Sequence, residues 1–443
     1  MQIDPEQAGL SGQGITTAAP TQVPDSSANP VAGSRLILLL ALACGVGVAN
    51  IYFPQAISPL IARGFHVPVG SAAGVVTATQ FGYAAGLFLL VPLGDRVFHR
   101  RLLAILLAFT GLGLLAAGSA PALPVLAAAS VVVGATTVVP QIIIPMAAGM
   151  VAPERRGAVT GTLLSGLIGG VLLARAFGGF LGQWLGWRAP YLVAALLALL
   201  LAVVLYAAVP QTTPPSRERY PRLLGATLSL LRSEPELRRS CLYQAAVFAG
   251  FNAAWTSIAL LVTGPRYGLG APAVGLIALV AAGSMSCTPI AGRAIDRHGS
   301  DVVSTVCILG VAASAAILLA GGDGGAAGMV ALVAGMLVLD VAMQSGQVAN
   351  QARIFALSPP MRSRLNTAYM TCAFLGGSIG SWLGVRAYID FGWGCVCGLV
   401  ALLAAITLAR HLVHLAKRQL PAAQADPADQ PAAAAAGQQE AGR

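Results

Sequence analysis

The sequence has few charged residues. Of its 443 residues, 9% are Asp, Glu, Lys or Arg and 56% are hydrophobic. A soluble domain carries about 25% charged residues, so this composition excludes a water-soluble fold and indicates an integral membrane protein. Lysine is almost absent, because the formal net charge of +10 arises from 25 Arg and one Lys against 16 acids. These charges lie between hydrophobic segments, which argues against nucleic-acid binding.

Signatures of catalysis and of nucleotide or metal binding are also lacking. There is no P-loop, no Rossmann glycine set and no H-E-x-x-H. Most of the seven cysteines lie in apolar runs, where a thiol behaves as a small hydrophobe. Cys395-x-Cys397 has no His or carboxylate pattern around it, so no metal site is expected. We therefore expect neither an enzyme nor a cofactor, and an ion gradient rather than ATP as the energy source.

Long apolar segments dominate the chain, and each is long enough to cross a bilayer or nearly so. The predicted fold is all-α, with twelve transmembrane helices in two pseudo-symmetric six-helix bundles. The expected spans are residues 36–60, 71–94, 102–120, 123–151, 157–182, 191–209, 240–264, 274–294, 302–320, 328–352, 365–388 and 393–412.

The segments outside these spans are polar. Residues 1–34 and 414–443 are predicted to be disordered cytoplasmic tails, and the first has no signal-peptide pattern. Bundles at 35–210 and 239–413 are joined by a linker at 211–238. Within that linker, Leu224, Leu228 and Leu231 recur at helical spacing, which predicts a short helix on the membrane surface.

Loop charges predict the orientation. If the N-terminus is cytoplasmic, 21 of the 26 Lys and Arg lie in cytoplasmic segments or span ends. Only Arg63, Arg188, Arg266 and Arg386 then lie outside, and Arg175 lies within a span. This satisfies the positive-inside rule and places both termini in the cytoplasm.

The two halves repeat one another. Asp95-Arg96 and Asp296-Arg297 each follow the second span of their half, 201 residues apart. At an offset of 206, Gln141 matches Gln347, and several Gly, Pro, Arg and Trp positions match as well. Parallel halves with a site between them are a transporter architecture.

One predicted span carries a polar stripe. Asp340, Gln344, Gln347 and Gln351 are spaced i, i+4, i+7 and i+11, which places them on one helix face. Asp340 is the only acid deep in any apolar segment, where a carboxylate costs about 2.5–3.5 kcal/mol. The stripe therefore predicts the lining of a transport pathway. Polar contacts between helices are the alternative, which suits the amides better than the carboxylate.

After the second span, the chain reads Val91-Pro-Leu-Gly-Asp95-Arg96-Val-Phe-His99-Arg100-Arg101. This resembles the G-x-L-x-D-R-x-G-R-R loop of the major facilitator superfamily, without its two glycines, and the resemblance extends over residues 35–413. The second copy, Gly292-Arg-Ala-Ile-Asp296-Arg297-His-Gly299, keeps both glycines. The resemblance implies a gate loop on the cytoplasmic side, formed by Asp95, Arg96, Arg100, Arg101, Asp296 and Arg297. Retention of basic loops inside the cell is the alternative.

The fifth span resembles the family's antiporter motif, with glycines at 161, 170, 178 and 179, but Ala174-Arg175 replaces Gly-Pro. Such glycines also serve close helix packing. Arg175 could bind a carboxylate or phosphate, or it could extend toward the outer interface or bond helix carbonyls, and the functional and structural interpretations both stay open. Depth along the helices predicts no tight ion pair between Arg175 and Asp340. The fourth span lacks the intramembrane Arg that many proton-coupled members carry near Gly134.

Further polar and aromatic side chains fall within the spans. Each is more often a helix contact than a ligand contact. With Arg175, Gln344 and Gln347, the candidates for the cavity are Asn50, Gln55, Gln80, Tyr83, Gln141, Asn252, Trp255 and Tyr369. Tyr52 and Asn366 are also polar span residues. The local sequences around Asn50 and Gln80 resemble bacterial drug and sugar efflux permeases.

These observations predict a secondary transporter of a small organic molecule in the bacterial inner membrane, with proton-coupled export and Asp340 as the proton-binding group. The expected partners are substrate, protons and membrane lipids, and we expect a monomer. A proton-coupled uptake symporter or a uniporter is the nearest alternative. A non-transporting receptor on the same fold is the alternative from another class.

Overall fold

The computed structural model describes residues 33–211, 219–358 and 361–423. The helices, in chain order, are α1 (Ser34–Phe65), α2 (Val69–Leu89), η1 (Val91–Asp95), α3 (His99–Gly118), α4 (Leu123–Thr136), α5 (Val139–Gly149), α6 (Pro153–Leu185), α7 (Arg188–Ala208), α8 (Tyr220–Ser233), α9 (Pro235–Thr263), α10 (Ala271–Ala281), η2 (Ala282–Cys287), α11 (Thr288–Ala320), η3 (Gly321–Asp323), α12 (Gly325–Leu357), α13 (Arg362–Phe391) and α14 (Trp393–Ala423).

Ten segments in the described part of the chain are long and apolar enough to cross a membrane. Two of the twelve expected spans are helical but are not among these ten. One is α13, whose polar residues lower its hydropathy, and the other is the short α10 together with η2. The all-α fold class is confirmed. The parts of the predicted tails at 1–32 and 424–443 lie outside the described residues, whereas α14 continues to Ala423, past the predicted tail boundary at 414.

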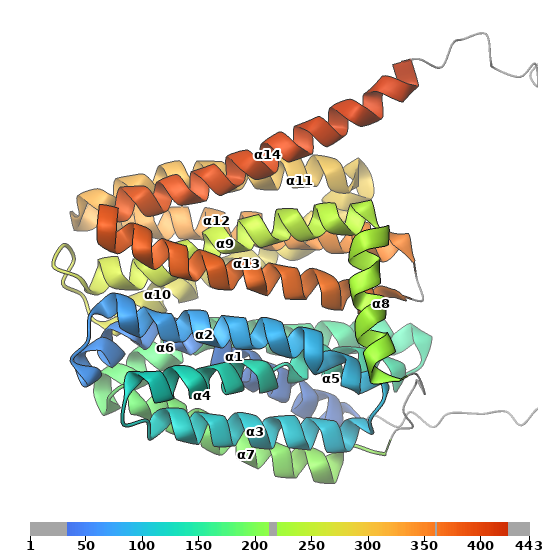
Figure 1. Ribbon diagram of the computed structural model, residues 1–443, viewed down its shortest axis with the longest axis horizontal. Coiled ribbons are helices and arrows are strands. Elements are labelled where there is room, and N and C mark those ends of the chain that lie inside the picture. The colour runs from blue at the N-terminus through green and yellow to red at the C-terminus, as the bar shows by residue number, and fades with distance from the viewer. Residues whose placement is uncertain (1–32, 212–218, 359–360, 424–443) are drawn as a thin grey trace, which may run out of the picture.

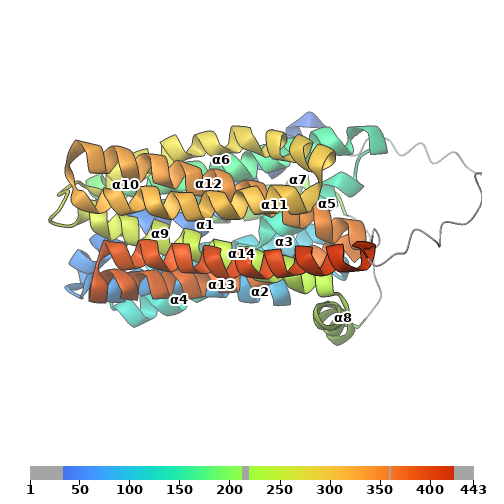
Figure 2. The ribbon, with the colours of Figure 1, turned by 90° about the horizontal axis from the view of Figure 1, so that it is seen from above.

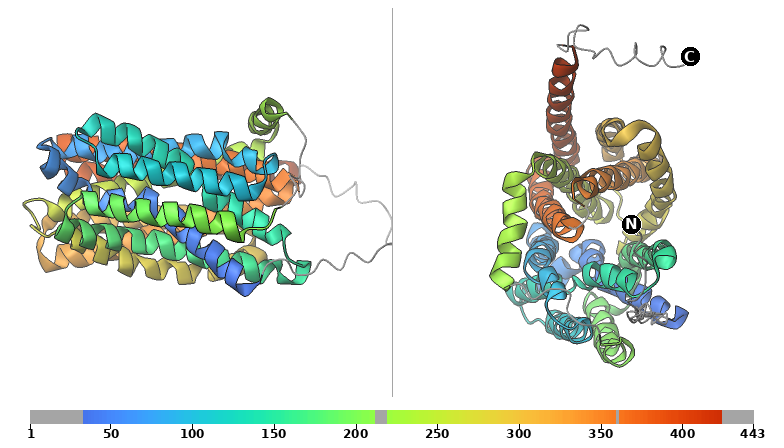
Figure 3. Two further views of the ribbon diagram at one scale, coloured as in Figure 1. Left: turned by 90° about the horizontal axis from the view of Figure 1, so that it is seen from below. Right: turned by 90° about the vertical axis from the view of Figure 1, so that its right-hand side faces the viewer.

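The helices form two groups that lie side by side (Figure 1). The first group runs from α1 to α7 and the second from α9 to α14, and Figure 2 shows the long axes of the rods running in one direction. Helix α8 crosses one end of the molecule, which we call the α8 end, and Figure 3 shows it lying across both groups there. The opposite end, which holds the connection between α9 and α10, is called the far end.

Helix α8 lies within the predicted linker and carries Leu224, Leu228 and Leu231 of the predicted stripe. Leu223, Thr227 and Leu230 are buried, whereas Leu228 is 51% exposed. The hydroxyl of Tyr220 donates a hydrogen bond to the carbonyl of Leu89 at the end of α2. The helix therefore packs on the protein through the face of Leu223, Thr227 and Leu230, and Leu228 lies outside that face.

Glycines allow the central helices of each half to pack closely. A Cβ atom on Gly170 of α6 would lie 2.2 Å from the carbonyl oxygen of Gly45 on α1. The matching residue in the second half, Gly376 of α13, would place a Cβ 2.3 Å from the carbonyl of Ala245 on α9. Because Gly170 and Gly376 are related by the repeat, the two halves use one packing solution.

Two of the rods are interrupted. The fourth rod breaks between α4 and α5, where Pro140 cannot donate a backbone hydrogen bond. In α11 the break is at Gly299, whose φ of 80° disrupts helical geometry. Residues 288–298 therefore continue the eighth rod, so Asp296 and Arg297 lie on a helical segment.

The two halves meet closely at the far end. A Cβ on Gly275 of α10 would lie 2.7 Å from the Cα of Ala176 on α6, and one on Gly179 would lie 2.7 Å from the carbonyl of Ala271. No side chain larger than hydrogen fits at these two positions without movement. The helices α6 and α10 thus close the space between the halves at this end.

Candidate functional site

A central cavity of about 110 Å³ lies between the two halves. Helices of both halves line it, and its walls combine aromatic rings, amides and two charged groups. Its polar and aromatic lining consists of Tyr52, Tyr83, Gln141, Arg175, Gln244, Phe248, Phe251, Trp255, Ser284, Asp340, Gln344, Gln347 and Phe374.

Asp340 reaches the cavity from the middle of α12. Gln344 and Gln347 follow on the same wall, as their helical spacing predicts, whereas Gln351 lies beyond the cavity and donates to the Asn366 amide oxygen at 3.4 Å. The Asp340 side chain is buried, and its Oδ2 has no hydrogen-bond partner within the described residues, although the Trp255 indole lies beside the carboxyl. A buried carboxyl in such a setting is a functional candidate.

Arg175 reaches the same cavity from α6 in the other half. Its guanidinium carbon lies 4.0 Å from the ring centre of Trp255 and 4.9 Å from that of Tyr52. Its Nε donates a hydrogen bond of 2.9 Å to the side-chain oxygen of Gln55, and its Nη2 has no partner within the described residues. The residue is 2% exposed, so the alternative that it extends to the outer interface is wrong.

A chain of amides behind the wall holds Arg175 in place. Gln55 donates to Asn252 at 3.2 Å, and Gln80 donates to the same oxygen at 2.6 Å. Asn252 donates in turn to the carbonyl of Phe248 at 2.9 Å. Gln55, Gln80 and Asn252 were predicted to line the cavity, but none of them does. Each amide is directed at another amide or at Arg175, so together they support the wall.

Asn50 and Tyr369 were also predicted to line the cavity, but their side chains bond other protein groups instead. Asn50 donates to the hydroxyl of Thr137 at 3.2 Å, next to the break between α4 and α5. The hydroxyl of Tyr369 donates to the side-chain oxygen of Gln244 at 2.8 Å. Neither side chain lines the cavity. Tyr83, Gln141, Arg175, Trp255, Asp340, Gln344 and Gln347 do so, as predicted.

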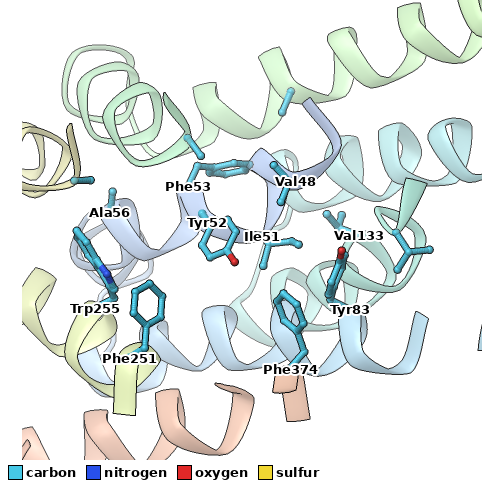
Figure 4. Close-up of a cluster of buried hydrophobic side chains, with 14 of the residues drawn as sticks. Val48, Ile51, Tyr52, Phe53, Ala56, Tyr83, Val133, Phe251, Trp255 and Phe374 are labelled. Carbon is cyan, nitrogen blue, oxygen red and sulfur yellow. The ribbon is translucent and has the colours of Figure 1, made fainter. Parts of the chain in front are cut away.

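An aromatic wall was missed from the sequence. Phe374 lies 4.4 Å from Tyr83 and 4.9 Å from Phe248, measured between ring centres. Phe251 continues the wall, 5.6 Å from Phe248 and 6.3 Å from Trp255. Figure 4 shows Tyr83 and Phe374 facing one another across the two halves and Phe251 next to Trp255. The spacing of residues 248, 251 and 255 on one helix face was the signal available for three of these rings.

A second cavity of about 340 Å³ lies on the α8 side of the first, and Gln141 lines both. Asp95 and His99 of the predicted gate loop line this second cavity, together with Ser363 of the other half. Arg100 stacks 4.4 Å above the ring of Tyr206. The second cavity therefore lies between the central site and the α8 end.

The second half carries an ion-pair cluster near the α8 end. Arg353 and Arg239 each lie 2.9 Å from the same oxygen of Asp301. Arg353 also donates to Asn350 at 2.7 Å, and Asn350 donates to Gln244 in the cavity wall at 3.3 Å. Polar contacts therefore run from the cavity to this cluster.

Asp296 and Arg297, the second-half copy of the predicted gate, are not members of the Asp301 cluster. Both side chains are exposed on the part of α11 that precedes the break at Gly299. The sequence repeat gave no signal for the Asp301 cluster, because its members come from three separate helices.

Comparison with known proteins identifies the family. The sequence model described as the Major Facilitator Superfamily matches residues 37–288. The chain belongs to this family. It is 37% identical over 373 residues to the uncharacterised transporter YgaY of Escherichia coli O157:H7, covering 84% of this chain and 94% of that protein. It is 35% identical over 398 residues to the "Probable transporter SCO4007" of Streptomyces coelicolor, covering 88% and 91%.

Two more distant similarities agree with this family. A chloramphenicol resistance protein of Streptomyces lividans is 30% identical over 273 residues, covering 61% of this chain and 68% of that protein. The solved structure of the nucleoside transporter NupG aligns with a TM-score of 0.67 at 13% identity, covering 87% of this chain and 99% of that one. This major facilitator is therefore a multi-pass membrane transporter of small molecules. Within its described residues, no group of three or more His, Cys, Asp or Glu could hold a metal ion.

Proposed function

We propose that this protein is a secondary active transporter that exports a small organic molecule in exchange for protons. The observation that carries the proposal is the Asp340 carboxyl, which is buried in the cavity between the halves and has an unpartnered Oδ2 among the described residues. An ionisable group in such a place binds and releases protons in membrane transporters. Gln141, Gln344 and Gln347 supply hydrogen bonds to substrate from the same walls.

Alternating access is the proposed mechanism. The halves meet at the far end through Gly179 and Gly275, while a second cavity extends from the centre toward the α8 end. Opening the contact between α6 and α10 and closing the space beside Asp95 would expose the central cavity to the opposite side. In this proposal the loop of Asp95, Arg96, Arg100 and Arg101 controls closure at the α8 end.

The positive-inside rule supports the proposal that the α8 end and both termini face the cytoplasm, and we propose a bacterial inner membrane as the location. The structure then corresponds to the inward-facing state. Export is supported by the efflux-like local sequences and by the likeness to a chloramphenicol resistance protein. A proton-coupled uptake symporter is the second candidate. The protein is proposed to act as a monomer, since one chain forms the whole cavity.

The test is transport by purified protein in liposomes with an imposed pH gradient, across a panel of metabolites and drugs. Substrate movement opposite to the proton gradient supports exchange, and movement in the same direction supports symport. If no compound responds to the gradient while some equilibrate through the protein, proton coupling is wrong and a uniporter remains.

A further inference from the structure

The two charged groups of the central cavity lie in different halves and do not pair with each other. No salt bridge joins Arg175 to Asp340 in the described residues. Each keeps one buried polar atom without a hydrogen bond there, Nη2 on Arg175 and Oδ2 on Asp340. Gln55 and two aromatic rings contact the guanidinium, which interacts with the Asp340 carboxyl through its charge and not through a salt bridge.

This arrangement selects a ligand by its charge. A carboxylate ligand is attracted to Arg175 but repelled by ionised Asp340. A simple cation is attracted to Asp340 but repelled by Arg175. A zwitterion satisfies both groups at once and leaves the cavity electrically neutral. A guanidinium also binds a carboxylate in planar two-point geometry, which favours a carboxylate at the anionic end.

The walls add a preference for one aromatic ring. Phe248, Phe251 and Trp255 form a continuous surface that ends at the guanidinium of Arg175. Rings offset or edge-on to such a surface are favoured beyond their buried area. The cavity measures about 110 Å³, and a cavity of about 150 Å³ binds benzene. The central space is smaller than that, so a ligand with one ring and short polar groups must extend past Gln141 into the second cavity of about 340 Å³.

We propose that the central cavity binds a small aromatic zwitterion, with its carboxylate at Arg175, its ammonium at Asp340 and its ring on the wall of Phe248, Phe251 and Trp255. This inference rests on the proposed transport function and names its substrate class. The ammonium and the proton compete for one carboxylate, so binding of one releases the other. Exchange of substrate for proton follows from that competition.

Three compounds with one skeleton test the class: phenylalanine, 3-phenylpropionate, which lacks the ammonium, and 2-phenylethylamine, which lacks the carboxylate. Binding to the purified full-length protein in lipid nanodiscs is measured by calorimetry. We expect phenylalanine to bind at least tenfold more tightly than 3-phenylpropionate or 2-phenylethylamine. Alanine, which lacks the ring, should bind more weakly than phenylalanine. Equal binding of the three, tighter binding of a singly charged compound, or no binding of any of them overturns the proposal.

Two variants assign the ends of the ligand. Arg175→Gln should abolish the preference for phenylalanine over 2-phenylethylamine, and Asp340→Asn should abolish the preference over 3-phenylpropionate. Asp323→Asn, in the turn before α12, is the control and should keep both preferences. Thermal unfolding checks that each variant is folded. If both preferences survive in Arg175→Gln and Asp340→Asn, the assignment is wrong.

The proposed function can fail separately from this class. If a pH gradient drives another compound while none of the three binds, the transporter proposal stands and the aromatic zwitterion does not. If phenylalanine binds with the expected preference but no gradient moves it, the ligand class stands and proton coupling does not.

Discussion

The guanidinium of Arg175 donates a hydrogen bond of 2.9 Å to the side-chain oxygen of Gln55, and the ring of Trp255 covers one face of the group at 4.0 Å. Arg175 is thereby held in the cavity wall, opposite a carboxyl from the other half with which it forms no salt bridge in the described part of the chain. A charge fixed in this way is ready for a ligand, because little side-chain entropy remains to be lost on binding.

Gln55→Leu should release this restraint. Ordering the freed Arg175 side chain on binding then costs about 0.5–1.5 kcal/mol, which corresponds to a roughly two- to tenfold loss of affinity for a carboxylate ligand. Calorimetry on purified protein measures it. Gln183→Leu, an exposed glutamine on α6, is the matched control. An unchanged affinity in Gln55→Leu would show that Arg175 needs no support from this amide.

Asp340→Asn should abolish transport driven by a pH gradient while the protein remains folded. The amide has nearly the shape of the carboxyl but does not bind or release a proton at this site. Uptake into liposomes with and without a gradient measures the loss, and thermal unfolding checks the fold. Gln351→Glu places an acid one helical turn beyond the cavity stripe and should not restore coupling to Asp340→Asn. Normal gradient-driven transport by Asp340→Asn would remove this residue from the mechanism.

Asp95→Asn should slow transport and leave substrate binding nearly unchanged. Asp95 lines the second cavity on the α8 side of the site, away from the central lining. The substitution should therefore slow the conformational change between the inward-facing and outward-facing states. Turnover in liposomes and affinity on purified protein are compared with those of Asp296→Asn, the exposed copy in the second half. A loss of affinity with unchanged turnover of bound substrate would contradict the gate.

Gly275→Ala should weaken closure at the far end. The added Cβ would lie 2.7 Å from the Cα of Ala176, so α10 and α6 must separate. We expect faster hydrogen exchange of the backbone in residues 271–281, measured by mass spectrometry. Gly161→Ala is the control, because no atom lies within 4 Å of a Cβ at that position. Equal exchange in both variants would mean that this contact does not hold the far end closed.

Arg353→Met should lower stability by about 2 kcal/mol. Breaking a buried ion pair costs about 3–5 kcal/mol, but here Asp301 is 24% exposed at its side chain and keeps Arg239, so the cost is reduced. Thermal unfolding in detergent measures the difference, with the exposed Arg293→Met as control. A shift no larger than that of the control would show that the cluster contributes little to the fold.

The sequence by itself determined the class of this protein and the positions of its spans. Scarcity of charge allows only a membrane fold, and in lipid the backbone must satisfy its hydrogen bonds within helices. The spacing of Asp340, Gln344 and Gln347 placed them on one face, and all three line the cavity. Helical periodicity is local, so it can be derived from neighbours along the chain.

Only the tertiary structure decided which other polar side chains face the cavity. Gln55 and Asn252 lie on helices whose polar residues point in several directions, and which of these directions meets the cavity depends on the packing of neighbouring helices. Gln244, Phe248 and Phe374 belong to the lining for the same reason. Depth along the helices already predicted that Arg175 and Asp340 form no tight ion pair, but the contacts of Arg175 with Gln55 and Trp255 depend on how helices of both halves pack. Periodicity describes one helix, whereas a site between two bundles is defined by how several helices are rotated against one another.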